Sequence, residues 1–275
     1  MEGGDQRGMI IPLAQLVKAK RPRLRRLVLR PIEPTASFEA ELYAIHYWVV
    51  QQWREFIFST IATSYERPAP FVADADGQQL QWIIDQKNAD INSRIIYQTE
   101  KMGRWVTKLG KWHGSKTISA VKSATGVDIE PFIRLGDIRE QLDTTIRENT
   151  NLISGLNADA KLRVEQVLFD SFAMRKTKAA TVKALAEAMG ITQRRARRIA
   201  TDQTHKLGSI LTQIRQQQMG FEKYKWITRG DDRVRPAHRS RNGRIFRWDK
   251  APYDGHPGYP IMCRCIAEAY FDFED

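Results

Sequence analysis

The chain has 275 residues, and its 44 lysines and arginines outnumber 32 aspartates and glutamates to give a formal net charge of +12. A hydrophobic content of 42% and an aromatic content of 9% exclude general disorder, and the length suffices for two domains with separate cores. The apolar runs fall far short of the ~20 residues that cross a bilayer, and the N-terminus lacks the apolar core of a signal peptide. We therefore expect a soluble protein that is made in the cytoplasm and has no membrane partner.

Residues 1–35 form the first predicted segment, a basic N-terminal arm. Half of the net charge lies in residues 1–31, which hold eight lysines and arginines against two acidic residues. Such a run is typical either of a solvated tail or of an arm that contacts nucleic acid or an acidic protein surface. The candidate nucleic-acid or partner contacts are Lys18, Lys20, Arg21, Arg23, Arg25, Arg26 and Arg30.

Residues 36–155 form the second predicted segment, a helical platform, because apolar residues there recur at three- and four-residue spacings. We expect a core helix over residues 38–64, with Trp48 on its flank as a candidate partner contact. Further helices are expected around residues 80–95, 100–112, 116–125 and 136–149, with a stop at Gly126 and a hinge at 152–156. The core stripe of the first helix contains Leu42, Ile45, Val49, Trp53, Phe56, Ile57 and Ile61.

Residues 157–219 are predicted to form a helical hairpin. Asn157 is a candidate N-cap for a helix with Leu162, Val164, Val167 and Leu168 facing inward, and Thr192 is a candidate N-cap for a later helix. Four arginines, at 194, 195, 197 and 198, follow Thr192, a placement that the helix dipole disfavours. Two interpretations explain them: a helix-turn-helix that enters DNA, or a helix packed on the C-terminal residues with arginines paired to Asp202, Asp231 or Asp232.

Residues 220–275 are predicted to form a small β-rich module. Alternating residues indicate strands at 224–228 and 244–248, and Asn242-Gly243 is typical of a tight hairpin turn. A third strand is expected over residues 261–270, which would place Cys263 and Cys265 on the same face.

The two cysteines support two interpretations of this module. In the first, Cys263, Cys265 and His238 bind a metal ion, with zinc as the expected cofactor and Asp232 or His256 completing four ligands. In the second, the cysteines pack under Trp226 and Trp248, while Asp232 and Arg235 pair with Arg264 or His238 without an ion.

The order of signals from residue 194 onward resembles the phage head morphogenesis family, the minor head proteins related to phage Mu protein F. The resemblance covers roughly residues 155–270 and includes the segments DDRVRPAH and HPGYPIMCRC. Thr201 departs from the family pattern, in which arginine is common at that position. The matching motif residues are Asp202, Thr204, Trp226, Asp232, Arg235, His238, Gly243, Trp248, Pro257, Gly258, Cys263, Arg264 and Cys265.

These observations predict a mainly α fold: an extended helical N-terminal platform, a helical hairpin, and a small C-terminal α+β module that contains a β-hairpin. The resemblance implies a structural minor capsid protein of a tailed phage or prophage, made in the host cytoplasm and located in the virion near the portal vertex. Its implied partners are the portal protein, bound through residues 1–130, other head proteins and packaged double-stranded DNA, with no small-molecule substrate.

Two other classes of function stay open from the residues alone. Asp232, His238 and the cysteines are residue types found in Cys/His hydrolases and metal-dependent nucleases. A DNA-binding regulator would rest on the helix after Thr192 alone. We expect neither an enzyme nor catalytic residues, because the sequence contains no nucleophile elbow, phosphate loop or nuclease metal motif.

Overall fold

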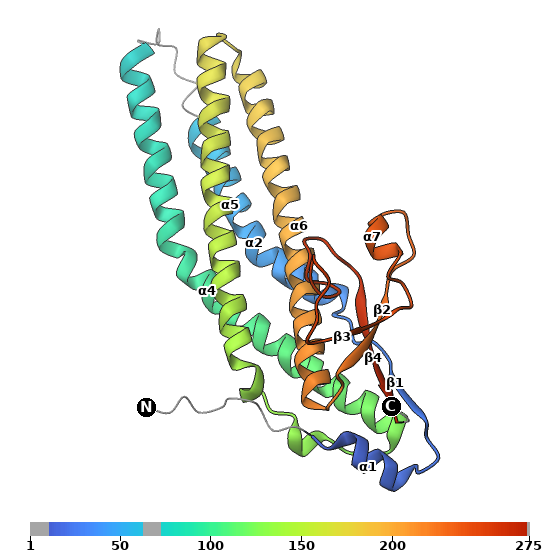
Figure 1. Ribbon diagram of the computed structural model, residues 1–275. Helices are drawn as coiled ribbons and strands as arrows, with labels where there is room; N and C mark the ends of the chain where they lie inside the picture. Colours follow the sequence, from blue (N-terminus) through green and yellow to red (C-terminus); the bar gives the residue numbers. More distant parts are fainter. Residues whose placement is uncertain (1–10, 63–72, 274–275) are drawn as a thin grey trace, which may run out of the picture. The chain divides into compact units, whose positions relative to one another are not determined.

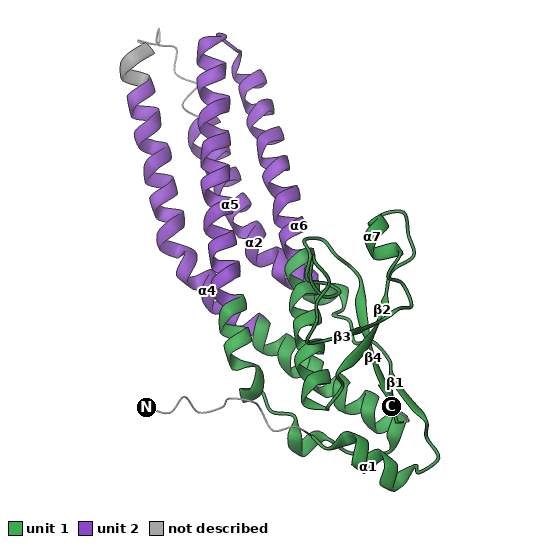
Figure 2. Cartoon of the chain, viewed as in Figure 1, with its two compact units in different colours: residues 1–38, 106–145, 202–275 green, residues 39–105, 146–201 purple. Residues whose placement is uncertain are grey.

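The computed structural model describes residues 11–62 and 73–273. Within them the chain is mainly helical and carries one small antiparallel sheet toward its C-terminus, which confirms the expected fold class (Figure 1). The chain forms two compact units, which Figure 2 colours separately. Unit 1 comprises residues 1–38, 106–145 and 202–275, and unit 2 comprises residues 39–105 and 146–201. Each unit is therefore assembled from separate stretches of sequence, unlike the consecutive segments that the sequence suggested.

The elements follow one another along the chain as long helices, then short strands. They are α1 (Leu13–Lys20), β1 (Arg26–Leu29), α2 (Ala36–Phe56), the π-helix η1 (Ile57–Ile61), α4 (Ala73–Thr125), the 3₁₀ helices η2 (Glu130–Phe132) and η3 (Gly136–Ile138), α5 (Arg139–Ala173), α6 (Lys178–Gln218), β2 (Lys223–Ile227), α7 (Pro236–Arg239), β3 (Ile245–Arg247) and β4 (Ile266–Asp272). None of the described helices contains a stretch apolar and long enough to span a membrane.

Unit 2 is built from parts of α2, α4, α5 and α6 together with η1. The stripe predicted for residues 38–64 is confirmed as core, because all seven of its residues are buried. Ile84, Ile91 and Ile95 of α4 are buried as well. Periodic apolar spacing therefore identifies most of this core correctly, although Leu162 of α5, predicted to face inward, is exposed.

Asn157 lies within α5 and caps no helix, so the predicted cap is wrong. Its side chain is fully buried and its Oδ1 accepts a hydrogen bond of 2.7 Å from the Trp53 indole. Its amide donates to Asn88 Oδ1 at 2.8 Å and to Asn92 Oδ1 at 2.9 Å. A residue type that favours caps serves here as the centre of a buried polar network between helices.

Three predicted interruptions lie inside continuous helices. The break between 112 and 116 falls in α4, the hinge at 152–156 in α5, and the turn around Thr192 in α6. A glycine inside a helix costs only about 1 kcal/mol relative to alanine, which tertiary packing readily outweighs. The Thr192 hydroxyl donates to the Ala188 carbonyl at 3.3 Å, as threonine does within a helix. The predicted stop at Gly126 is confirmed, since α4 ends at Thr125.

The continuity of α6 also rules out the helix-turn-helix interpretation, because no turn separates two helices between residues 178 and 218. The alternative pairing of its arginines with Asp202, Asp231 or Asp232 is wrong as well. Arg195 forms an ion pair with Asp159 at 3.3 Å, and the Arg197 guanidinium lies 4.8 Å from the ring centre of Tyr43. Both contacts lie within unit 2.

The sheet lies in unit 1 and has the strand order β1-β4-β2-β3, with every neighbouring pair antiparallel. Its edge strand β1 comes from the predicted arm, where Leu27 and Leu29 are buried and alternate with exposed Arg26 and Val28. The tail interpretation is therefore wrong for the described part of the arm. The core under this end of the sheet contains Ile11, Leu13, Val17, Leu27, Leu29, Val121, Val127, Ile129, Met219, Phe221 and Ala269.

The predicted strands around 224–228 and 244–248 are confirmed as β2 and β3, but the turn between them differs. The two strands are separated by residues 228–244, which include α7, so Asn242-Gly243 is not a two-residue hairpin turn. Gly243 has a φ of 77°, while Asn242 Oδ1 accepts the Thr228 amide at 2.9 Å and so fastens the long connection. The third strand, β4, begins at Ile266, which leaves both cysteines in the loop before it.

Candidate functional site

The C-terminal module contains a second, aromatic core. Alternation along β2 turns Tyr224 and Trp226 inward, and neither has exposed surface. The members of this cluster are Tyr224, Trp226, Trp248, Cys263, Cys265 and Ala267, with Phe246 packed against them. The cysteines therefore share a core with the two tryptophans, as the second interpretation of the module predicted.

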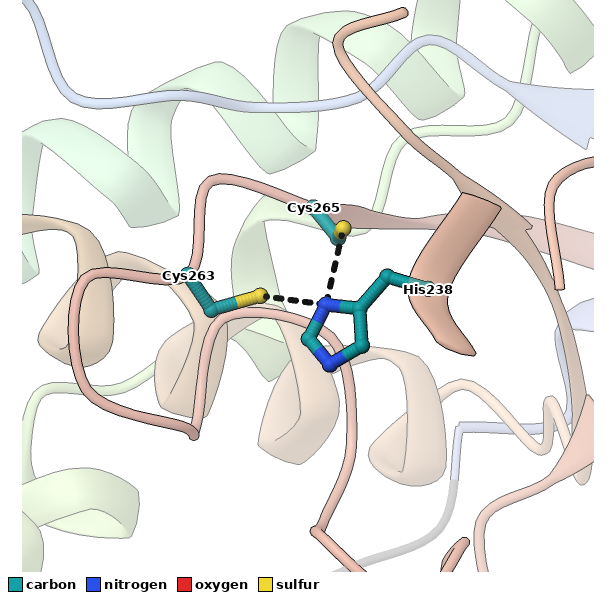
Figure 3. Close-up of side chains that lie close together, drawn as sticks. All are labelled: His238, Cys263 and Cys265. Atoms are coloured by element: carbon teal, nitrogen blue, oxygen red, sulfur yellow. Dashed lines mark hydrogen bonds between the residues drawn. The ribbon is translucent and has the colours of Figure 1, made fainter. Parts of the chain in front are cut away.

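His238 meets both cysteines inside this core (Figure 3). The short helix α7 begins at Pro236 and presents the imidazole, which is only 2% exposed, while each cysteine is 5% exposed. His238 Nδ1 lies 3.5 Å from Cys263 Sγ and 3.5 Å from Cys265 Sγ. The three side chains predicted from sequence thus converge on a single point, with their ligand atoms within 4.8 Å of one another.

The other ring nitrogen of His238 contacts a carboxylate. His238 Nε2 lies 2.9 Å from Asp254 Oδ2, and Arg241 donates to Asp254 Oδ1 at 2.6 Å. Partial burial opposes ionisation of Asp254, but hydrogen bonds from Arg241 and His238 keep the pKa of its carboxyl below the usual value. Asp254 is therefore an anion that orients the imidazole. The Arg241 guanidinium also lies 4.9 Å from the ring centre of Trp226.

The two thiols differ in how readily they ionise, and Cys263 loses its proton before Cys265. The Cys265 thiol hydrogen-bonds to Cys263 and lowers the pKa of Cys263 to about 5 despite burial, and the Gly258 amide at 3.4 Å adds to this effect. The same pairing, together with burial, raises the pKa of Cys265, since its ionisation would place two negative charges side by side. A thiolate beside an imidazole can bind a metal or act as a nucleophile.

Charged residues tie together the two loops that bring these groups to one point. Arg264 donates to both carboxylate oxygens of Asp231 at 2.7 Å, and Arg235 donates to the Ile261 carbonyl at 2.6 Å. Asp202 of α6 accepts the amide of Met262 at 2.5 Å. The first two contacts join the loop before α7 to the loop before β4, and the third fastens the latter loop to α6. The predicted roles of Asp232 and Arg235 as partners of Arg264 or His238 are therefore wrong: Asp231 holds Arg264, and Asp254 holds His238.

Two predicted metal ligands lie outside the cluster. Asp232 is exposed, and His256 Nδ1 forms a 2.9 Å hydrogen bond with the Tyr224 hydroxyl. His256 packs edge-on against Trp248, with the ring centres 4.9 Å apart, and burial lowers the pKa of its imidazole. His256 is thus a core residue, and the candidate ligand set reduces to His238, Cys263 and Cys265.

The remaining motif residues shape the same region. Gly258 follows buried Pro257 with a φ of 83°, and a Cβ at this position would overlap the Ser209 side chain of α6. Buried Thr204 has no hydrogen-bond partner for its hydroxyl among the described residues. Trp248 donates from its indole to Gln216 Oε1 at 3.2 Å.

The basic segment makes specific contacts within unit 1. Lys20 donates to the Gly126 carbonyl at 2.7 Å, Arg21 donates to the Ala124 carbonyl at 2.8 Å, and Arg26 pairs with Asp272 at 3.3 Å. These three cations hold the segment against α4 and β4. Arg23 and Arg30 project into solvent as exposed residues.

Sequence reasoning missed Asp254, Arg241 and Gln216, which orient the central side chains. Asp254 stands before Gly255 in a turn and carries no motif that pairs it with a histidine 16 residues earlier. Its pairing depends on the fold of residues 228–265, so periodicity gave no signal for it.

Comparison with known proteins places this site inside a family match. Residues 133–268 match the family model described as Phage Mu protein F like protein. This match confirms the resemblance to phage head morphogenesis proteins, a structural rather than enzymatic family. An uncharacterized protein of Haemophilus influenzae strain Rd is 26% identical over 276 residues, covering 94% of this chain and 58% of the relative. The chain therefore spans 58% of the length of that relative. No solved structure matches.

Proposed function

We propose that this chain, a phage Mu protein F like protein over residues 133–268, is a minor capsid protein of a tailed phage or prophage. It is made in the host cytoplasm and enters the head near the portal vertex during assembly. There it binds the portal protein or neighbouring head proteins and touches the packaged double-stranded DNA. The observation that carries the proposal is the family match, which contains all of α5 and α6 and the whole candidate site.

The chemistry of the motif residues agrees with a structural role. Arg264, Asp231 and Arg235 connect loops, and Gly258 permits a close approach to α6. Cys265 borders a cavity of only about 20 Å³, which offers room for about one water molecule rather than a substrate. Neither thiol is displayed at an open surface, as a nucleophile acting on DNA or protein would need to be.

The direct test is whether the chain co-purifies with heads. Heads from an induced prophage that carries the chain would be purified by density gradient and analysed by quantitative mass spectrometry. We expect the chain in the particles, in few copies relative to the major shell protein. A chain that stays entirely in the lysate supernatant while heads form normally would overturn the proposal.

An exposed apolar line on α4 supports a protein partner for residues 1–130. The stripe of α2 is buried in unit 2, so it is not available to a partner. On α4, Trp82 and Ile96 are 62% and 60% exposed and lie 14 residues apart, on the same side of a helix. Tyr97, beside Ile96, is also 60% exposed. Exposed aromatic and large aliphatic side chains on one side of a helix are typical of protein interfaces.

Point variants in the full chain test this surface. A deletion of residues 1–130 would not, because it would also remove strand β1 from the sheet. Trp82→Ser, Ile96→Ser and Tyr97→Ser combined should greatly reduce incorporation into heads while the melting temperature stays near that of the wild type. Ile261→Ser is the matched control, because this side chain is also exposed but lies outside residues 1–130. Equal incorporation of the triple variant and the control would show that the α4 line is not the interface.

The basic segment supports the DNA contact through its outward-facing cations. Lys20, Arg21 and Arg26 are engaged within unit 1, whereas Arg23 and Arg30 are exposed near the two ends of β1. Cations that meet phosphates release counterions, so binding is independent of sequence and weakens steeply with salt.

A salt titration of duplex DNA binding measures this contribution. Replacing Arg23 and Arg30 by glutamine should lower the slope of log affinity against log salt by up to about 2, because each phosphate contact contributes about 0.9. Lys176→Gln with Lys183→Gln removes the same charge from exposed sites of unit 2 and is the control. If both double variants give the wild-type slope, the segment does not bind DNA.

A further inference from the structure

We propose that His238, Cys263 and Cys265 bind one zinc ion, which joins α7 to the loop before β4 and stabilises the C-terminal module. This inference concerns the stability of the module and does not depend on the proposed place of the chain in a phage head.

The spacing of the three ligand atoms fits a tetrahedral ion. With Zn–S near 2.3 Å and Zn–N of 2.0–2.1 Å, a sulfur and a nitrogen on the same tetrahedral zinc lie about 3.6 Å apart. His238 Nδ1 lies 3.5 Å from each sulfur. The two distances therefore match two edges of one coordination tetrahedron, and the third edge, between the sulfurs, is no longer than 4.8 Å.

Hydrogen bonding alone does not let Nδ1 of His238 pair fully with both sulfurs at once. A neutral imidazole nitrogen offers one proton or one lone pair, so Nδ1 makes one good hydrogen bond and here faces two sulfurs at equal distance. All three side chains are buried, so water does not easily supply further partners. A cation at the centre accepts the lone pair of the imidazole and both thiolates at once.

The surroundings of His238 have the arrangement typical of a metal-bound histidine. Its far nitrogen, Nε2, donates to Asp254 at 2.9 Å, and Asp254 is held in turn by Arg241. A histidine whose proton is fixed on one nitrogen by a carboxylate directs its lone pair from the other nitrogen toward the metal. Here that second nitrogen is Nδ1, the atom that faces the sulfurs.

The backbone near Cys263 favours a thiolate ligand as well. The Gly258 amide donates to Cys263 Sγ at 3.4 Å, and amide groups of this kind offset the charge of a metal-bound sulfur. Two thiolates and one imidazole are soft and borderline ligands, a set that favours zinc over magnesium or calcium. The described residues supply three ligands, and a solvent oxygen takes the fourth position.

The first test measures metal in the full-length protein. Chain purified without an affinity tag that binds metals should contain one zinc per molecule by mass spectrometry of the elements. Excess chelator should remove the zinc and lower the melting temperature, and added zinc should restore it. X-ray absorption at the zinc edge should show two sulfur and two nitrogen or oxygen neighbours. Protein that is metal-free after growth in zinc and after zinc addition, with a melting temperature unmoved by chelator, would overturn the site.

The second test uses variants that keep the fold. Asp254→Asn retains all three ligands and should weaken zinc affinity about 10- to 100-fold in a competition with a fluorescent chelator, as loss of such a carboxylate typically does. Asp232→Asn makes the same change on an exposed carboxylate of the same module and should leave affinity unaltered. Cys263→Ser with Cys265→Ser should abolish stoichiometric binding. Retention of one tightly bound zinc by this cysteine-free variant would place the metal elsewhere and overturn the proposal.

Discussion

The helical unit 2 and the C-terminal module of unit 1 are stabilised in different ways. In unit 2, a long apolar stripe that includes Leu42, Val49 and Trp53 is buried, and many hydrophobic contacts contribute to stability. In residues 220–275 the strands are short, and a few specific contacts hold long loops, such as Arg264 with Asp231 and His238 with Asp254. We therefore expect substitutions at exposed positions of unit 2 to be tolerated, whereas substitutions at the contact points of the module should destabilise it even where the residue is partly exposed.

The largest expected effect is at Gly258, a contact point of the module. Gly258→Ala should destabilise the protein by about 3 kcal/mol or more, because the new methyl group overlaps Ser209 and the backbone has a φ of 83°. Chemical denaturation followed by tryptophan fluorescence measures the change in the free energy of unfolding.

Gly230→Ala provides the matched control for backbone conformation. Its φ of 74° is similar, but a Cβ there meets no atom within 4 Å, so only the conformational cost of about 1–2 kcal/mol applies. Equal losses in the two variants would mean that the approach of Gly258 to α6 contributes nothing, and the contrast between the two regions would weaken.

A second substitution tests the buried polar network around Asn157. In this network, unlike in the apolar stripe of unit 2, a few specific contacts are concentrated on one residue. Asn157→Ala leaves the Trp53 indole and the side-chain oxygens of Asn88 and Asn92 without this partner, and should cost about 3 kcal/mol. Asn151→Ala changes the same residue type on the exposed side of α5 and should alter stability by less than about 0.5 kcal/mol. Similar changes in the free energy of unfolding for both variants would show that the network does not contribute more to stability than an exposed asparagine does.

The smallest effect per residue is the loss of stability at acidic pH that comes from two buried histidines, His46 in unit 2 and His113 in unit 1. Burial lowers the pKa of His46 to about 4 and that of His113 to about 3, against an ordinary value of 6.5. Because the unfolded state binds the proton more readily, stability is full above pH 6.5 and falls as the pH decreases toward these values. At pH 5 each histidine should account for a loss of about 2 kcal/mol relative to neutral pH.

Glutamine variants assign this loss to the two units. His46→Gln should flatten the pH dependence of unfolding for unit 2, and His113→Gln should reduce it for unit 1, where His256 also contributes, as read by hydrogen exchange of each unit between pH 7 and pH 5. A wild type whose stability is unchanged over this range would contradict the buried, neutral state of both side chains.

The sequence predicted the core of unit 2 well because burial on a helix repeats every three to four residues, as the stripe from Leu42 to Ile61 shows. It failed at helix ends, since Asn157, Gly190 and Thr192 favour caps or breaks locally but lie inside α5 and α6. Their tertiary environment outweighs local preference, and no local pattern reports that environment.

The candidate site was predicted in part for a similar reason. The residue types of His238, Cys263 and Cys265 identified the three converging groups. Their orienting partner Asp254 and the choice of Asp231 over Asp232 depend on how the loops between β2 and β4 fold. Strand β1 was missed because its charged residues suggested a tail, although Leu27 and Leu29 alternate with exposed residues, as in a half-buried strand.

The most direct test of the proposed role is the position of the chain in purified heads. A short epitope inserted after Met174, a 67% exposed residue in the turn between α5 and α6, would be labelled with gold-conjugated antibody fragments in opened particles and imaged by electron cryomicroscopy. The proposal predicts label at one vertex per head, the vertex that carries the portal. Label distributed evenly over the shell, or absent from heads that contain portal and DNA, would contradict it.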